Sequence, residues 1–163
     1  MSSDKLHYVC ARAIIVRNGK FLIAKRSPRE KVSPGKWTTP GGKLETSDYE
    51  KRPLDTYNAW YNVLEDLLRR EVMEETGLVI KNIRYLTSLS FFSPDGSPYV
   101  VVSFFTESDA GAVRLCPDLT EYAWVTLEEA RKYDLIDGIY EELVMADSYM
   151  KGNPVESWRR AHE

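Results

Sequence analysis

The stretch from residue 60 to residue 78 constrains the fold of this chain more than any other. Its apolar side chains recur at helical spacing, which predicts a helix that packs on a core through one face: Trp60, Val63, Leu64, Leu67, Leu68 and Val72. In such a helix Glu71, Glu74 and Glu75 lie at positions i, i+3 and i+4, together on another face. The sequence therefore predicts a helix that ends at Gly77 and carries three carboxylates near that end.

Three carboxylates within one helical turn repel one another, at a cost of roughly a few tenths of a kcal/mol per pair. Two arrangements relieve this repulsion. The acidic face is dispersed in water, as runs of charge commonly are, or a hard cation binds among the carboxylates. Ligands that offer only oxygen suit Mg²⁺ or Mn²⁺ rather than zinc. This segment alone leaves both arrangements open.

A glycine segment about thirty residues upstream favours the cation. Residues 37–45 read WTTPGGKLE. Pro40-Gly41-Gly42 predicts the end of a strand, at a point where the backbone can come close to a ligand because glycine has no side chain. Backbone carbonyl groups at such a turn can join carboxylates in the oxygen shell of a metal ion.

Together these segments resemble the motif of the Nudix hydrolase superfamily. The family pattern is Gly, five residues, Glu, seven residues, then Arg-Glu-hydrophobe-x-Glu-Glu-x-Gly-hydrophobe. Residues 70–78 (REVMEETGL) match every specified position of the second half, and Gly42 is followed by five residues and then Asp48. The chain departs from the pattern in two ways. An aspartate, Asp48, replaces the first glutamate. Twenty-one residues rather than seven separate it from Arg70, which is an insertion of about fourteen residues.

A second alignment keeps the seven-residue gap and places Asn62 at the first acidic position. We prefer Asp48, because the glycine segment then runs into it without a gap. The inserted segment, residues 49–62, is rich in aromatic residues. We expect it to lengthen and anchor the helix, and the alternatives are that it covers the site or forms a subunit contact.

The resemblance implies an α/β fold, a Nudix-type α/β/α sandwich with a mixed β-sheet. The order of strands, a long helix, more strands and final helices favours the same layers. By the resemblance, Glu74, Glu75 and the carbonyl group of Gly41 bind the metal ion. Glu71 is a further metal ligand or the general base. Arg70 has a catalytic role as a bidentate brace for the carboxylates rather than as a contact to the substrate.

Some members of the family take the general base from a later loop. Glu121, just before the expected strand at residues 122–125, is the candidate here, with Asp118 as a weaker alternative and a solvated loop acid as the other interpretation. Glu45 matches a family position near the metal shell and is a predicted substrate contact. A salt bridge from Glu45 to Arg70 accounts for it equally well.

Basic residues that can face a phosphate lie on the first hairpin and the loop after it: Arg12, Lys25, Arg26 and Lys36. Strand alternation puts Arg12 on the apolar face of Cys10 and Ile14, and an arginine that faces a core must be paired or bind an anion. Arg12 and Arg26 are the predicted substrate contacts among these residues.

Aromatic residues on later strands are candidates to stack on a base. Phe91 is the predicted contact, and Phe92 and Tyr99 are further candidates. Aromatic side chains in strands more commonly belong to the core, so both interpretations remain open.

The favoured function follows from the chemistry of a phosphoanhydride. Water must attack a phosphorus atom surrounded by negative oxygens, which calls for cations and for a base that activates the water. The sequence predicts a Mg²⁺-dependent pyrophosphohydrolase that acts on a nucleoside diphosphate linked to another group, or on a nucleoside triphosphate. A non-hydrolytic nucleotide-sensing or protein-binding module is the alternative. A third possibility, an isoprenoid diphosphate isomerase, would need a catalytic cysteine and a further His-rich metal site. His7 and His162, at opposite ends of the chain, do not provide that metal site.

The remaining elements follow from alternation, turn residues and caps. Asn18-Gly19 predicts a hairpin turn, and Ser47–Glu50 or Pro53 can begin the first helix. Thr126–Glu129 forms a second capping box, for a helix to about residue 133, and residues 136–144 predict an amphipathic helix. Strands are expected at residues 6–17, 20–26, 37–39, 78–85, 86–92, 99–106, 113–115 and 122–125.

Composition bounds the class of protein. The chain has 163 residues, which predicts one domain over residues 1–150 and a poorly fixed tail over residues 151–163. A net charge of −3 predicts no nucleic-acid partner, and no apolar run reaches the length of a membrane span. With no signal peptide expected and only Cys10 and Cys116, we expect buried thiols in a reducing cytoplasm. The family resemblance leaves a homodimer open.

Overall fold

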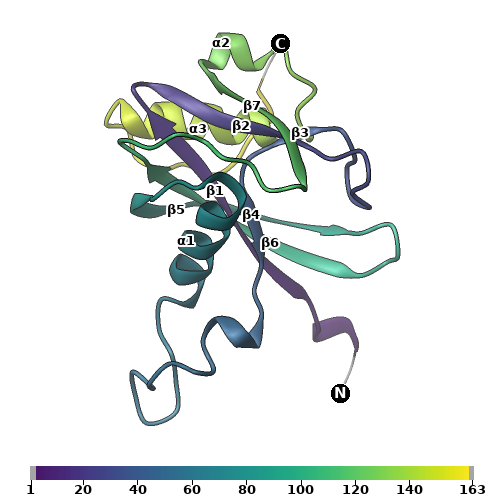
Figure 1. Cartoon of the computed structure of the whole chain (residues 1–163), viewed down its shortest axis with the longest axis vertical. Coiled ribbons are helices and arrows are strands. Elements are labelled where there is room, and N and C mark those ends of the chain that lie inside the picture. The colour runs from purple at the N-terminus through teal and green to yellow at the C-terminus, as the bar shows by residue number, and fades with distance from the viewer. Residues whose placement is uncertain (1–2, 162–163) are drawn as a thin grey trace.

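A mixed β-sheet forms the centre of the molecule in the computed structural model, which describes residues 3–161 (Figure 1). The strand order is β3-β2-β1-β6-β5, with β4 alongside β1 and β7 alongside β2. β1 and β6 are parallel, and the other pairs are antiparallel. The strands are β1 (Tyr8–Arg17), β2 (Lys20–Arg26), β3 (Trp37–Thr38), β4 (Gly41–Lys43), β5 (Lys81–Phe92), β6 (Pro98–Glu107) and β7 (Leu119–Val125).

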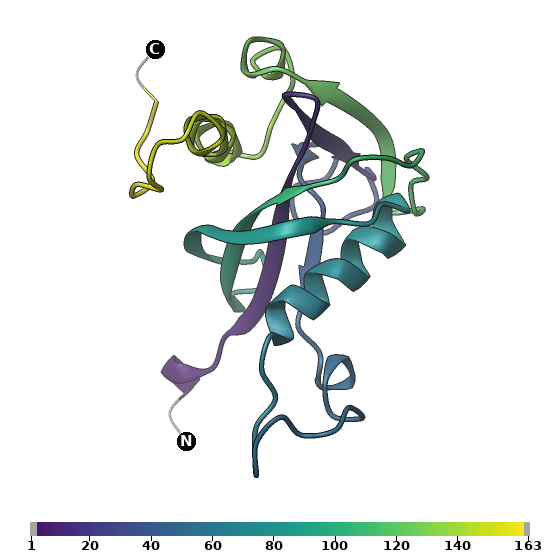
Figure 2. The same cartoon turned by 90° about the vertical axis from the view of Figure 1, so that its left-hand side faces the viewer.

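Helices cover the two faces of this sheet, with α1 (Val63–Thr76) on one side and α3 (Ile139–Met150) on the other (Figure 2). The alternation of β1 builds both halves of the core. Ala13 and Ile15 pack with residues of α1, whereas Ile14 and Val16 pack with residues of α3. The predicted α/β sandwich with a mixed sheet is confirmed.

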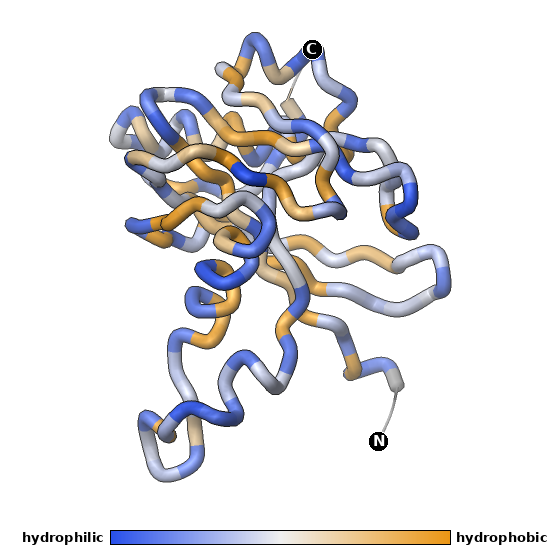
Figure 3. Tube along the Cα trace, viewed as in Figure 1, coloured by the Kyte–Doolittle hydropathy of each residue, from blue (hydrophilic) through white to orange (hydrophobic). Residues whose placement is uncertain are grey.

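The helix α1 begins later than expected, because the inserted residues do not extend it. Asn62, directly before α1, has a φ of 56°, a left-handed conformation that a continuing helix does not allow. The expected capping box at residues 47–50 does not form. The box joins Glu45 and Asp48 instead, on the short 3₁₀ helix η2 (Thr46–Asp48). Residues 49–62 form a mostly hydrophilic loop that projects below the sheet (Figure 3).

This loop nevertheless anchors the start of α1. Arg52 forms an ion pair with Asp66 in the first turn of the helix, and its guanidinium donates to the carbonyl oxygen of Tyr61 at 3.1 Å. The indole of Trp60 donates to the carbonyl oxygen of Arg52 at 3.0 Å, and its ring centroid lies 5.2 Å from that of Tyr49. The expectation of an anchor holds, and that of a longer helix is wrong.

Other differences from the expected elements have local causes. Residues 78–92 were expected as two strands, but β5 is continuous from Lys81, and a register shift between Tyr85 and Thr87 breaks the alternation there. Residues 113–115 form no strand, because Arg114 donates to the carbonyl oxygen of Thr76 at the end of α1. The glycine segment expected as a turn is itself the strand β4, paired with β1.

The final helices differ from their expected bounds: the helix after Thr126 ends at Ala130 rather than near residue 133, and α3 begins at Ile139 rather than at residue 136. Thr126 caps α2 (Leu127–Ala130) through the predicted box with Glu129. The tail contacts the region before α3, because Trp158 donates to the carbonyl oxygen of Gly138 at 3.2 Å and Arg160 pairs with Asp137 at 2.6 Å. The described part of the tail is therefore docked on the domain, although it contains no helix or strand.

Cys10 and Cys116 are free thiols, and both are partly buried rather than buried as expected. Within residues 3–161 no helix is long and apolar enough to cross a membrane.

An ion pair between β1 and α3 holds the second layer to the sheet. The Arg12 guanidinium contacts the Glu142 carboxylate, and the side chains are 13% and 1% exposed. The contact uses one oxygen of Glu142, and both the other oxygen and the Nε of Arg12 are buried without a hydrogen-bond partner within the described chain. Arg12 is therefore paired, which was one of the two outcomes that its place on an apolar face allowed.

Removal of one partner of this pair should destabilise the fold far more than removal of both. We expect Glu142→Leu to lower the free energy of unfolding by about 3–5 kcal/mol, because it leaves a buried charge alone. The double variant Arg12→Met/Glu142→Leu should recover most of that loss. Urea unfolding measures both values. Asp147→Ala, which removes an exposed i,i+4 pair with Lys151 on the same helix, is the control and should cost less than about 1 kcal/mol.

Candidate active site

The strand β4 and the helix α1 meet at Gly41 and Glu75. The backbone N–H of Gly41 donates to Oε2 of Glu75 at 3.0 Å. Ala13 donates to the carbonyl oxygen of Pro40, and Leu44 donates to that of Val9, so the even-numbered residues of this segment face β1. Gly41 therefore turns both its N–H and its carbonyl group away from β1, on the edge that meets α1. A backbone oxygen and the Glu75 carboxylate thus lie on the same side of β4.

The two glycines are needed for two different contacts. A Cβ atom at Gly42 would lie 2.2 Å from Cδ of Glu71, so this glycine makes room for that carboxylate. A Cβ atom at Gly41 would lie 2.2 Å from the carbonyl oxygen of Ala11 and 2.8 Å from Cα of Arg12. Glycine at this position lets β4 lie close to β1.

Arg70 connects three carboxylates at the middle of α1. Its guanidinium lies 2.6 Å from Asp48, 3.0 Å from Glu71 and 3.0 Å from Glu74. Burial alone would lower the pKa of Arg70, but these carboxylates outweigh it and raise the pKa. Asp48, which is 5% exposed, is the acid that reaches the helix, in agreement with the preferred alignment. The alternative salt bridge from Glu45 to Arg70 does not form, since Glu45 caps η2.

The charged form of the Glu75 side chain is disfavoured by its surroundings. Burial raises its pKa to about 8; the bond from Gly41 and the charge of Arg26 act in the other direction, and the charges of Glu71 and Asp118 add to the increase. Burial also raises the pKa of Glu71, while Arg70 opposes the shift. The nearby positive charges therefore do not offset the burial of the two carboxylates that border the glycine segment.

Oxygen donors of this kind fit a hard divalent cation, although they are not fully assembled. In the described part of the chain, no three His, Cys, Asp or Glu side chains are gathered closely enough to hold an ion as they stand. Glu71 and Glu75 face the glycine segment, whereas the Glu74 side chain is 58% exposed and bonded to Arg70. A role for Glu74 as a metal ligand requires its release from Arg70 and stays a prediction.

The two candidates for a general base on the later segment lie in different environments. Glu121 is on β7, where its carboxylate is 56% exposed and pairs with Lys25 at 2.8 Å. The charge of Asp118, just before β7, acts on Glu75. The negative charge that affects Glu75 is therefore that of Asp118, the weaker candidate in the sequence, and not that of Glu121.

The basic side chains that were predicted to contact phosphate also lie in different environments. The charge of Arg26 acts on Glu75, and its guanidinium bonds to Glu30 at 2.9 Å and to the carbonyl oxygen of Val32 at 2.8 Å. Arg12 points to α3 and is neutralised by Glu142. Lys36 pairs with Asp134 at 2.6 Å, away from α1. Of these residues, Arg26 is the one whose charge reaches the site.

Lys43 and Tyr8 were not singled out from the sequence. The Lys43 ammonium lies 5.4 Å from the ring centroid of Tyr8 and 5.5 Å from that of Tyr99. Phe91, the predicted stacking residue, lies with its ring centroid 5.0 Å from that of Tyr99. The signal in the sequence was weak, because only the pairing of β4 with β1 brings Lys43 to these rings.

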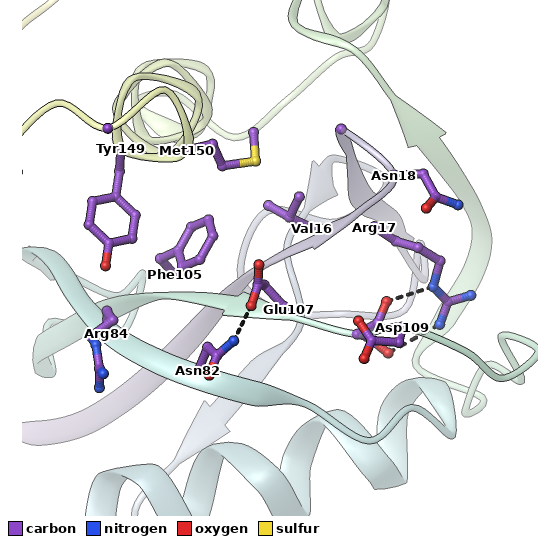
Figure 4. Close-up of a pocket in the computed structure, with 13 residues that line it drawn as sticks. Val16, Arg17, Asn18, Asn82, Arg84, Phe105, Glu107, Asp109, Tyr149 and Met150 are labelled. Carbon is purple, nitrogen blue, oxygen red and sulfur yellow. Dashed lines mark hydrogen bonds between the residues drawn. The ribbon is translucent and has the colours of Figure 1, made fainter.

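A hollow of about 770 Å³ lies at the opposite end of β1 (Figure 4). Its lining includes Val16, Phe105, Tyr149 and Met150, with Asn82 bonded to Glu107 at one side. It contains none of the carboxylates of α1, so the chemistry places the candidate site at β4 instead.

Comparisons with known proteins agree with this geometry. Residues 7–144 match the NUDIX domain, and the chain belongs to that family. The prediction of a Nudix hydrolase is thereby confirmed at the level of the family. A crystal structure of a MutT protein from Methanosarcina mazei is similar with a TM-score of 0.67 and 25% identity, over 92% of this chain and 99% of that chain.

Two curated relatives carry more specific names. The nucleoside triphosphatase NudI of Klebsiella pneumoniae is 28% identical over 133 residues, which cover 75% of this chain and 84% of that protein. The NAD-capped RNA hydrolase NudC of Chromobacterium violaceum is 30% identical over 104 residues, which cover 64% of this chain and 32% of that protein. The chain thus matches about a third of the length of this second relative.

Alanine at the two glycines should separate binding from stability. Gly42→Ala pushes against a side-chain carboxylate that can move, so we expect unchanged urea stability but about 10- to 100-fold weaker Mg²⁺ binding. Gly41→Ala meets the backbone of β1, which cannot move, and should cost about 1–3 kcal/mol of stability. Calorimetric Mg²⁺ titration and urea unfolding test both. Equal effects of the two variants on stability would contradict the geometry.

The pH dependence of stability should reveal the buried carboxylate of Glu75. Because its folded pKa of about 8 exceeds the ordinary value of 4.5, the folded state favours the protonated form. Its contribution to stability is complete below the ordinary value and is lost as the pH rises through the folded pKa. In a chelator, Glu75→Gln should therefore melt close to the wild type near about pH 5 and clearly above it near about pH 8. A difference in melting temperature that is independent of pH would rule this out.

Proposed function

We propose that this chain is a divalent-metal-dependent pyrophosphohydrolase. It cleaves a phosphoanhydride bond of a nucleoside diphosphate linked to another group, or of a nucleoside triphosphate. The observation that carries the proposal is the placement of Glu75 and Glu71 against Gly41 and Gly42. This arrangement brings together a backbone carbonyl group and two carboxylates whose charge the nearby cations do not fully offset.

Mg²⁺ is the proposed ion, with Mn²⁺ as an alternative, because the donors are all oxygens. Glu71, Glu75 and the Gly41 carbonyl group would hold it, with Glu74 joining when it leaves Arg70. When bound, the ion would neutralise charge that develops on the phosphate oxygens and lower the pKa of a water molecule.

Side chains of this protein would position the ligands, supply charge near the phosphates and accept the proton from water. Arg70 positions Glu71 through the contact at 3.0 Å and is itself fixed by Asp48 at 2.6 Å. Arg26 supplies positive charge near the phosphates, since its charge already acts on Glu75. The base that takes a proton from water is Asp118, Glu71 or Glu121. Asp118 is favoured over Glu121 because its charge acts on Glu75, whereas Glu121 pairs with Lys25.

The names of the relatives support a nucleotide substrate, because one is a nucleoside triphosphatase and the other acts on NAD-capped RNA. A cytoplasmic location and a homodimer remain part of the proposal. A non-hydrolytic nucleotide sensor on the same fold is the competing function, and the Glu74–Arg70 contact is compatible with it.

Phosphate release from a panel of nucleotides, with and without Mg²⁺, tests the proposed activity. We expect hydrolysis that requires the metal, and Glu75→Gln should lower kcat at least about 100-fold because a ligand of the ion is lost. Glu65→Gln, in the first turn of the same helix, is the matched control and should retain the activity of the wild type. Tight binding of a nucleotide without cleavage of any would favour the sensor instead.

A further inference from the structure

Three aromatic rings stand side by side on the face of the sheet that carries α3. Tyr8 of β1 is in register with Tyr99 of β6, which is in register with Phe91 of β5. The ring centroids of Tyr8 and Tyr99 are 5.0 Å apart with planes inclined by 28°, and those of Tyr99 and Phe91 are 5.0 Å apart with planes inclined by 14°. These three residues are called the aromatic row below.

The helix α3 does not cover this row. Residues of α3 pack with Ile14, Leu86 and Phe105, farther along the same strands. Figure 2 shows α3 beside the C-terminal half of β1, away from the start of that strand. None of the three rings belongs to either buried core cluster, and Tyr8 is 52% exposed. Core packing therefore does not account for the row.

The row continues into the candidate active site through β4. Lys43, two residues after Gly41, is exposed and holds its ammonium over Tyr8 and Tyr99. Gly41 is opposite Arg12, and Tyr8 lies four residues before Arg12, roughly 13 Å away along the strand. A nucleotide can bridge this distance, with its phosphates beside Gly41.

We propose that the aromatic row stacks the base of the nucleotide on the open side of Tyr8, and that Lys43 binds a phosphate next to it. This inference rests on the proposed function, whose substrate class it narrows. Stacking accepts any base, because every base has a π face and stacking requires no hydrogen bond to the edge of the base. The site should therefore bind nucleotides with different bases and discriminate against phosphate compounds that have no aromatic group.

Binding of product-like ligands tests this without any catalysis. Calorimetry with Mg²⁺ should show that AMP and CMP bind with affinities within about tenfold of each other, and both more tightly than ribose 5-phosphate. Tyr8→Leu should weaken AMP binding by about 10- to 100-fold and leave ribose 5-phosphate unaffected, whereas Tyr8→Phe should bind AMP like the wild type. Because Tyr8 is half exposed, the variants should fold normally.

Tyr85→Leu is the matched control, since Tyr85 is 56% exposed on β5 but lies outside the row. Unchanged AMP binding in Tyr8→Leu, or AMP no tighter than ribose 5-phosphate, would overturn the stacking site. So would loss of a dimer in Tyr8→Leu with nucleotide binding intact, because the row would then be a subunit contact.

The outcomes also distinguish failure of the stacking site from failure of the proposed hydrolase activity. If AMP binding depends on Tyr8 but no nucleotide is cleaved, the stacking site stands and the proposed activity fails. If nucleotides are cleaved with Mg²⁺ and KM does not change in Tyr8→Leu, the activity stands and the stacking site fails.

Discussion

The close approach of β4 to α1 is the constraint on which the candidate site depends. Gly41 donates its backbone N–H to Glu75 because the odd-numbered groups of β4 face away from β1. Only glycine allows β4 to lie so near both β1 and the helix. The opposite side of α1 buries Leu67, Leu68 and Val72 in the core. Burial of apolar surface, the main driving force of folding, thus presses two mutually repelling carboxylates against the glycine segment.

What the sequence predicted well is local. The end of α1 at Gly77, the hairpin at Asn18-Gly19 and the capping box at Thr126 each depend on neighbouring residues, and all three form. The match of residues 70–78 to a family motif likewise involves only the last two or so turns of one helix and its cap. Short-range patterns of this kind determine backbone conformation before any tertiary contact is made.

What the sequence could not give depends on partners far apart in the chain. The partner of Arg12 lies 130 residues away on α3, so alternation predicted a buried arginine but not what pairs with it. Likewise, the pairing of β4 with β1 brings Lys43 to the rings of Tyr8 and Tyr99. Asp118 and Glu121 are close in sequence, yet the strand pairing of β7 takes Glu121 to Lys25.

The insertion shows why the spacing of a motif is less restrictive than its geometry. Twenty-one residues separate Asp48 from Arg70, yet their side chains meet at 2.6 Å. The entropic cost of closing a flexible loop grows only with the logarithm of its length, so the fourteen or so extra residues cost about 1 kcal/mol. The ion pair of Arg52 with Asp66 and the hydrogen bond from Trp60 to Arg52 hold the two ends of the loop together and reduce that cost. Asp48, which follows the glycine segment, therefore reaches Arg70 on the helix despite the longer connection.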